Sequence, residues 1–357
     1  MNSRVSSIFD GNSIIHAAIT NSDRMAFITK EEPSDSKRAK LGDDQLATCV
    51  VYYNKNANWD AEKHHFGYKG WSKGMRRAYV VFPGKNSLNN LVFCGVEGSG
   101  RCTMAEGPDD DVWFEKSLNI IKPFDNHKAM LTATNIDGEV YFGGNIRKLY
   151  KRTDKNEWVD LTDENEHPNL HEDVRSALDS GRSIRSVPVG FDAIDGYSKS
   201  DIYGCGDGGD LWHFSGKNWR RLAPPVNFDM ECIVCAGDGN VYIGGAMGGL
   251  IRGRFDPETG HEQWEEIKTP LSGSESRFTS LAWFQNRLYL GNDWALYHLT
   301  AEDKVEKVAF PKGGATQYSF QYVTACDTAL LSYGPHQALV FDGEKWEQIV
   351  GVIEIPQ

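Results

Sequence analysis

The sequence predicts an all-β fold, a single seven-bladed β-propeller built from four-stranded antiparallel blades. Three observations support this prediction: a recurring phrase, its period and a regularly placed tryptophan. The phrase is a short strand, a glycine turn, a second strand, a polar gap and a third strand opened by tryptophan. It reads GNVYIGGAMGGLIRGRF from Gly239 and GEVYFGGNIRKLYKR from Gly138. It returns at about 40–50 residues, the length of a four-stranded propeller blade.

The recurring phrase divides the chain into seven units, at approximately 13–68, 77–118, 128–161, 187–222, 231–267, 277–309 and 321–350. A tryptophan opens the expected fourth strand at Trp113, Trp158, Trp219, Trp264 and Trp346. Val305 takes this place in the sixth unit, and Trp59 stands only approximately there in the first. The ends 3–9 and 352–356 are spare strand-like pieces. Either could cross over to close the ring, because an open ring exposes sheet edges.

Long insertions fall at 30–46, 60–76 and 162–186, and all three are expected on one face of the propeller. Turns between second and third strands and the blade-to-blade connectors open on that face. A short helix is predicted near 169–180, because Asn169 can cap it and Leu170, Val174 and Leu178 share one side. This segment could bind a partner or pack back on the propeller as a lid.

Functional residues concentrate on the loops of a rigid scaffold, so this face is the predicted partner-binding surface. A tryptophan in a turn, as at Trp294, is costly to leave in water, and exposed aromatic side chains anchor interfaces. Trp294 could equally plug the central channel. The predicted partner-binding residues are Trp71, Glu97, Asn145, Arg147, Glu164, Glu166, Glu172, Asp173, Asp207, Met247, Asp293, Trp294 and His336.

Charge and composition exclude some classes of function. The chain has 50 acidic and 38 basic side chains, a formal net charge of −12. Direct nucleic-acid binding needs clustered lysine and arginine, so it is not expected. The negative charge serves either ordinary solubility or attraction to a basic partner.

The expected location is the cytosol, with reduced thiols. No window approaches 18 uncharged apolar residues, so no membrane span is expected. The N-terminus has no apolar core of signal-peptide length. Seven cysteines are an odd number and lack the dense spacing of a secreted disulfide scaffold.

Motifs that resemble chemistry are weak, and neither a catalytic residue nor a metal or cofactor is predicted. Gly204, Gly206 and Gly209 match a dinucleotide fingerprint, but a strand follows them where a helix is required. Cys232 and Cys235 would diverge on a strand, so they are expected to be buried structural thiols. The run 109–111 of three aspartates is interpreted as a solvated turn rather than a calcium site.

The repeat over about Lys128 to Val350 resembles bacterial β-propellers with BNR-like or kelch-like repeats. In overall character the chain resembles propeller-type immunity proteins of type VI secretion or contact-dependent effector–immunity pairs. That resemblance implies a non-catalytic cytosolic protein that binds a cognate antibacterial toxin in a 1:1 complex and occludes its active site. A nuclease toxin would have a basic cleft, and the acidic segment Asp163–Asp179 would then imitate nucleic-acid phosphate.

Two other classes stay open, because a propeller fold does not give function. One is a glycoside hydrolase or lyase with its site at the central channel, and the other is a scaffold in a larger assembly. An enzyme should bring charged residues from several blades into one pocket with perturbed pKa values. A binder should show a broad face of apolar and acidic side chains with exposed aromatic anchors.

Overall fold

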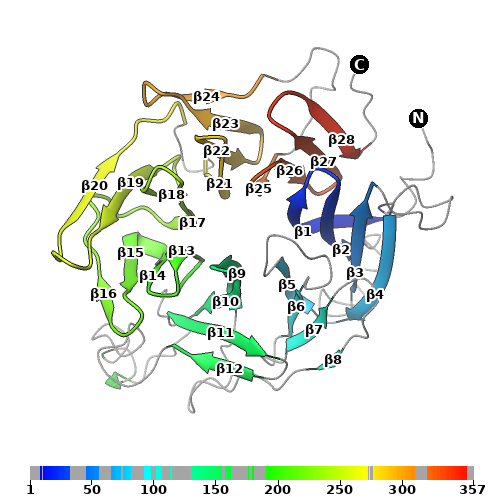
Figure 1. The fold of residues 1–357 in the computed structure, drawn as a ribbon, viewed down its shortest axis with the longest axis horizontal. Coiled ribbons are helices and arrows are strands. Elements are labelled where there is room, and N and C mark those ends of the chain that lie inside the picture. Colours follow the sequence, from blue (N-terminus) through cyan, green and yellow to red (C-terminus); the bar gives the residue numbers. More distant parts are fainter. Residues whose placement is uncertain are drawn as a thin grey trace.

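The computed structural model describes residues 9, 11–32, 46–55, 66–73, 75–81, 92–97, 102–106, 113–114, 130–145, 147–154, 157–161, 176, 179–180, 190–271, 273, 276–309 and 320–351, and within 66–130 only the backbone. These residues form seven four-stranded sheets arranged in a ring (Figure 1). Each sheet pairs four consecutive strands in antiparallel register, and its first strand lies nearest the centre of the ring.

The strands of the first three blades are β1 (Asn12–Asn21), β2 (Arg24–Glu31), β3 (Ala47–Asn54) and β4 (Phe66–Lys73); β5 (Met75–Val81), β6 (Val92–Glu97), β7 (Cys102–Glu106) and β8 (Trp113–Phe114); and β9 (Met130–Ile136), β10 (Glu139–Gly144), β11 (Lys148–Asp154) and β12 (Glu157–Asp160). The next two blades comprise β13 (Ala193–Ser198), β14 (Asp201–Gly206), β15 (Asp210–Phe214) and β16 (Trp219–Arg221), then β17 (Met230–Cys235), β18 (Val241–Gly245), β19 (Leu250–Phe255) and β20 (Glu262–Glu266). The last two comprise β21 (Ser280–Phe284), β22 (Arg287–Asn292), β23 (Ala295–Leu299) and β24 (Val305–Lys307), then β25 (Tyr322–Ala325), β26 (Leu330–Gly334), β27 (Gln337–Phe341) and β28 (Trp346–Val350).

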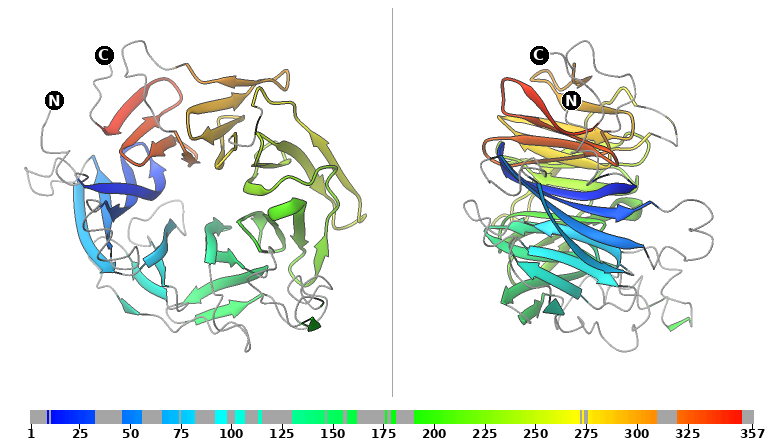
Figure 2. Two further views of the ribbon diagram at one scale, coloured as in Figure 1. Left: turned by 180° about the vertical axis from the view of Figure 1, so that it is seen from behind. Right: turned by 90° about the vertical axis from the view of Figure 1, so that its right-hand side faces the viewer.

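The prediction of an all-β propeller with four-stranded antiparallel blades is confirmed. Seen from the side in Figure 2, the blades stack with their faces against one another around the ring. Each inner strand contacts the inner strand of the next blade, as β13 contacts β17 and β17 contacts β21. The core therefore lies between blades rather than inside any single sheet.

The burial of each strand follows from its place in the blade. The second strands β18 and β26 are buried at all five positions, because a neighbouring blade covers each face of the sheet. The outermost strands β12 and β20 alternate between half-buried and exposed positions. Runs such as VYIGG are thus strands covered on both faces. The tryptophan-bearing segments are edge strands with one solvent-exposed face.

The glycines of the recurring phrase permit close approach between a blade and the connector that precedes the next blade. A Cβ on Gly204 would lie 2.6 Å from Cδ1 of Phe191, and a Cβ on Gly143 would lie 3.3 Å from Cβ of the same phenylalanine. Gly244 stands in the same relation to Phe278, at 3.1 Å. Both phenylalanines are fully buried. The glycines of the recurring phrase therefore leave the space that the phenylalanine side chain of the connector fills.

The substitution Gly204→Ala should destabilise the fold by about 1–3 kcal/mol, because its methyl group overpacks the ring of Phe191. Urea unfolding followed by circular dichroism measures this. In a Phe191→Leu background the cost of the alanine should shrink, because the smaller side chain leaves room. An equal cost in both backgrounds would show that the ring is not the obstacle.

The ring closes by packing between the first and last blades. Phe9, Ile14 and Met25 belong to one buried cluster with Leu331 and Val340 of the seventh blade. The backbone N–H of Ile14 also donates to the carbonyl of Pro335, at 2.7 Å. Both end blades use four consecutive strands, so among the described residues closure needs no strand crossing over from either terminus.

Three details of the sequence prediction need correction or remain outside the described residues. The fourth unit was expected to begin at 187, but its first strand, β13, spans Ala193–Ser198, and Phe191 lies in the connector. Gly196 and the polar residues that follow have low strand propensity, so the sequence pattern did not reveal this strand.

The expected insertion 60–76 contains strand β4 (Phe66–Lys73) and the start of β5. The insertions 30–46 and 162–186 lie mostly outside the described residues, and so does the helix predicted near 169–180. Inside the range 169–180, the N–H of Ser180 donates to the carbonyl of Ser176, at 3.1 Å.

A buried carboxyl links the fourth and fifth blades. Asp195 on β13 accepts hydrogen bonds from the backbone N–H groups of Cys235, at 2.7 Å, and Gly196, at 2.8 Å. Burial raises the pKa of Asp195 to about 6, although both hydrogen bonds oppose the shift. The protonated form is thus favoured by folding.

Replacement of Asp195 by asparagine should change how stability depends on pH. A carboxyl whose pKa rises from 3.8 to about 6 on folding stabilises the native state most below pH 4, and this contribution, about 3 kcal/mol, is lost as pH rises through 6. The difference in unfolding free energy between wild type and Asp195→Asn should therefore change by about that amount between pH 3 and pH 8. A constant difference would show that the carboxyl titrates normally.

Within the described residues, no helix is long and apolar enough to cross a membrane.

Candidate functional site

One face of the ring, which we call the turn face, carries most of the predicted binding residues. It is formed by the turns between second and third strands and by the connectors between blades. Backbone contacts join the two kinds of segment: the N–H of Gly208 donates to the side chain of Asp229, and the N–H of Gly248 donates to the carbonyl of Ser276. The turn face is therefore a set of short, mutually supported loops.

Two large apolar side chains are exposed on adjacent blades of the turn face. Trp294, in the turn between β22 and β23, is 79% exposed, and Met247, between β18 and β19, is 59% exposed. Val159 on the outer strand β12 is the other exposed large hydrophobic side chain in the described part of the chain. Trp294 thus lies in solvent and does not plug the channel.

The turns that carry Met247 and Trp294 are both fastened to the connector at Arg277. Ala246, next to Met247, pairs with Arg277 in a β-bridge. The carbonyl of Arg277 accepts a hydrogen bond from the side-chain amide of Asn292, at 2.8 Å, and the Oδ1 of Asn292 accepts one from the N–H of Trp294, at 2.9 Å. The two apolar side chains therefore stand on one preorganised support.

Four carboxylates gather along the same part of the turn face. We call them the acidic arc: Asp207 in the short 3-10 turn Asp207–Gly209, Asp229 and Glu231 at the entry to β17, and Asp293 beside Trp294. The guanidinium of Arg277 lies 3.4 Å from Glu231. With one arginine against four carboxylates, the formal charge of this group is −3.

Burial and neighbouring carboxylates raise the pKa of two members of the acidic arc, Asp207 and Glu231. Burial raises the pKa of Asp207, and the charges of Asp229 and Asp210 raise it further. Burial also raises the pKa of Glu231; Arg277 opposes this, and Asp229, Asp207 and Asp293 add to it. Within the part of the chain that the structure describes, one arginine does not neutralise the four carboxylates, so the arc carries a net negative charge there.

The side chain of Arg147, predicted to bind a partner, is buried and only 1% exposed. Its Nε lies 2.5 Å from Oδ2 of Asp210 in the next blade, and its Nη2 donates to Oδ1 at 3.0 Å. The guanidinium also lies over the ring of Trp212, with 5.1 Å between Cζ and the ring centroid. Arg147 therefore joins the third and fourth blades and is not presented to a partner.

The other predicted residues fall in different places. Glu97 ends β6 and His336 lies in the turn before β27, both on the turn face, and His336 is 3.6 Å from Glu32 of the first blade. Asn145 forms a β-bridge with Gly190. Trp71 lies within β4, at a register irregularity of an outer strand, and not in a loop as expected. Outside the described residues lie Glu164, Glu166, Glu172 and Asp173.

Sequence reasoning did not select Asp229, Glu231 or Arg277 as binding residues. Glu231 and Arg277 were taken as the first residues of the fifth and sixth units, and Asp229 fell just before the fifth unit. A usable signal existed, because residues just before a first strand lie on the same face as the turns between second and third strands.

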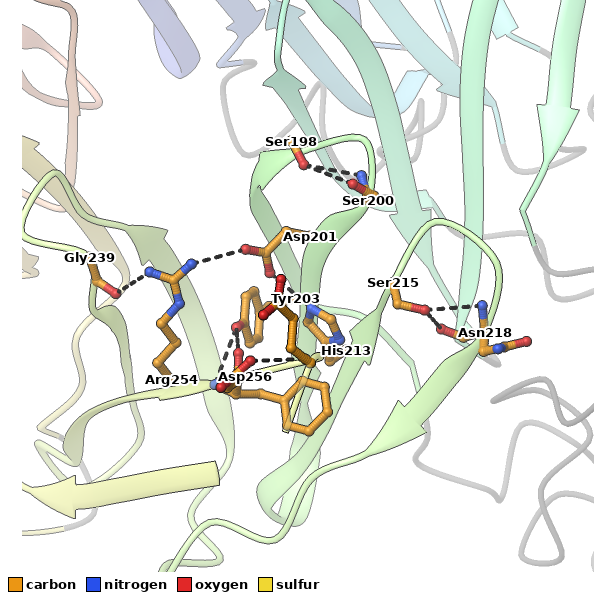
Figure 3. Close-up of polar contacts among 12 residues, drawn as sticks. Ser198, Ser200, Asp201, Tyr203, His213, Ser215, Asn218, Gly239, Arg254 and Asp256 are labelled. Carbon is orange, nitrogen blue, oxygen red and sulfur yellow. Dashed lines mark hydrogen bonds and ion pairs between the residues drawn. The ribbon is translucent and has the colours of Figure 1, made fainter. Parts of the chain in front are cut away.

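A second polar cluster lies between the fourth and fifth blades, on the opposite face (Figure 3). Asp201 accepts from Nε2 of His213, at 2.8 Å, and lies 3.4 Å from a guanidinium nitrogen of Arg254. The imidazole is fully buried between the rings of Tyr203 and Phe255, each at 4.8 Å. A histidine and an aspartate at this distance resemble catalytic partners, but a substrate cannot reach this histidine. The cluster holds two blades together.

The cysteines of the motif Cys232-x-x-Cys235 are free thiols, and burial raises the pKa of both. Among the described residues, no group of three or more histidine, cysteine, aspartate or glutamate side chains could hold a metal ion.

The fold defines the chain as a β-propeller protein whose turn face carries exposed apolar and acidic side chains. The chain is homologous to the immune protein Tsi7 of Pseudomonas aeruginosa, with 32% identity over 217 residues. The matched region is 60% of this chain and 62% of Tsi7, so it spans less than two thirds of that relative. No protein-family profile matches the sequence.

Several solved propellers have a similar fold. Sqt1 of Saccharomyces cerevisiae gives a TM-score of 0.57 at 9% identity, over 96% of this chain and 86% of Sqt1. YCF48 of Cyanidioschyzon merolae gives 0.57 at 8% identity, over 92% and 95% of the two chains. The WD40 propeller domain of Doa1 gives 0.54 at 11% identity, over 91% and 90%. At such identities these likenesses show the fold alone.

Substitution of Arg147 by alanine should destabilise the protein by about 3–5 kcal/mol, because it leaves the Asp210 carboxylate buried without its partner. Arg254→Ala, which removes a half-exposed ion pair with Asp201, should cost about 1 kcal/mol or less. Urea unfolding of both variants measures the contrast. Equal and small losses would contradict a structural role for Arg147.

Proposed function

We propose that this protein is an immunity protein that binds and neutralises a cognate antibacterial toxin in the cytosol of the cell that makes it. The observation that carries the proposal is the homology to the immune protein Tsi7 over 217 residues. The turn face supports it, because a rigid surface with exposed tryptophan and methionine among unmatched charges is typical of a protein-binding surface. The secretion route of the toxin would be type VI or contact-dependent.

In this proposal the toxin is inhibited by direct occlusion in a 1:1 complex. Short turns fixed by backbone hydrogen bonds lose little entropy on binding, so the surface is preorganised. Trp294 and Met247 would fill apolar depressions of the toxin, and the charged side chains around them would set orientation.

Co-expression tests the proposal directly. Each candidate toxin encoded beside the gene for this chain is expressed in a sensitive host, alone and together with this protein. Growth should stop with the toxin alone and recover with the pair, and size-exclusion chromatography should show one stoichiometric complex. If every neighbouring toxin remains lethal in the presence of this protein, the proposal is wrong.

A finer version of the proposal concerns the kind of toxin. If it is a nuclease, the acidic segment Asp163–Asp179 would occupy the basic cleft as a phosphate mimic. Replacing Glu164, Glu166, Glu172 and Asp173 by lysine should then abolish protection while the melting temperature changes little. Protection that survives these four substitutions excludes the phosphate-mimic version and leaves the immunity role intact.

A glycoside hydrolase is the second candidate, favoured by one observation. Asp207 and Glu231 come from different blades, and burial and neighbouring carboxylates raise the pKa of each. A raised pKa is what the acid of a glycosidase carboxyl pair requires. Reducing-sugar release from a panel of polysaccharides tests it, with Glu231→Gln as the variant that should lose activity. If wild type and variant release the same amount of sugar as buffer, the enzyme candidate is wrong.

A further inference from the structure

The acidic arc and the two exposed apolar side chains form one continuous surface. The N–H of Gly208, next to Asp207, donates to Oδ1 of Asp229 at 2.8 Å, and Glu231 lies 3.4 Å from Arg277. The carbonyl of Arg277 accepts from Asn292, next to Asp293, so carboxylates from three successive blades lie along linked segments. The connector at Arg277 joins these segments to the turns of Met247 and Trp294 through a β-bridge and two hydrogen bonds. The surface is thus bounded by the turns of the fourth, fifth and sixth blades, which are neighbours in the ring (Figure 1).

The charges of this surface restrict what can cover it. Nucleic acid would be repelled by the arc. A second copy of this chain would bring the same carboxylates and a net charge of −12, so self-association through this face is opposed by like charge. An internal cation is already present in Arg277, and it lies against Glu231 alone among the four carboxylates. The remaining kind of partner whose charge is complementary to the acidic arc is a cationic protein segment.

We infer that the acidic arc, Met247 and Trp294 form the docking site for a basic segment of the partner protein, in which arginine or lysine side chains alternate with apolar ones. The cationic groups would pair with the carboxylates of Asp207, Asp229, Glu231 and Asp293, and the apolar groups would pack on Trp294 and Met247. An indole ring that is 79% exposed also offers its face to a guanidinium. This inference rests on the proposed function, since it names the chemistry of the toxin surface that the immunity protein binds.

Two variants separate the apolar contribution to toxin binding from the electrostatic contribution. Trp294→Ala should weaken toxin binding by about 30-fold or more, mainly through faster dissociation, because a central exposed aromatic side chain behaves as an interface hot spot. The triple variant Asp207→Asn, Glu231→Gln and Asp293→Asn should slow association by about 10-fold at low salt and flatten its salt dependence.

Matched controls are available elsewhere on the molecule. Val159→Ala removes an apolar side chain that is 44% exposed on the outer strand β12. The triple variant Glu258→Gln, Glu302→Gln and Glu344→Gln removes three exposed carboxylates from turns on the opposite face. Both controls should bind within about twofold of wild type, because exposed surface changes away from an interface have small effects. Melting temperatures check that all four proteins are folded.

The first experiment is surface plasmon resonance with the toxin that co-expression identifies, at low and at moderate salt. If that toxin binds wild type and the Trp294 and acidic-arc variants equally, this inference is wrong although the immunity role stands.

A second probe does not depend on the toxin. A fluorescent peptide of alternating arginine and leucine is titrated by anisotropy against wild type, the acidic-arc triple variant and its control, which carry matched changes in net charge. Weaker binding to the acidic-arc variant than to its control supports the docking site. Equal binding to both triple variants would mean that only the net charge of the protein attracts the peptide, and it would overturn the inference whether or not a toxin is found.

Discussion

The close approach between blade glycines and a phenylalanine of the connector between two blades is the constraint on which the structure depends. Phe191 sits against Gly143 of the third blade and Gly204 of the fourth, and Phe278 repeats the contact at Gly244. A Cβ on Gly143 would lie 2.8 Å from Cγ2 of Ile194 in the next blade, so a side chain there would force the two blades to shift. Because the core lies between blades, their spacing fixes the angle at which each turn reaches the surface, so the same contact positions the turn face.

The buried polar groups reinforce that spacing. Arg147 and Asp210 join the third blade to the fourth, and the cluster around Asp201 and His213 joins the fourth to the fifth. A buried charge without its partner is costly. Each pair therefore stabilises the one arrangement of two neighbouring blades in which its partners meet. The result is a scaffold on which short turns can carry exposed Met247 and Trp294 without collapsing onto the surface.

The turn face combines two features that serve recognition in different ways. Exposed apolar side chains on fixed turns supply affinity, since little order must be gained on binding. In the proposed docking site the carboxylates would steer a cationic partner and repel both nucleic acid and further copies of the chain. In the proposed immunity role such a division of tasks would suit an inhibitor that has to bind its toxin both fast and tightly.

The sequence alone determined the propeller, because glycine, aromatic and tryptophan positions repeat locally and each blade depends on its own strands. It also placed Met247, Asp207, Asp293 and Trp294 on surface turns, since turn position follows from strand order. Only the tertiary structure decided that Arg147 is buried against Asp210, which lies 63 residues along the chain. It alone brought Asp229 and Glu231 together with Asp207 and Asp293. These contacts form between blades, and a local pattern carries no information about which side chains meet when separate repeats pack together.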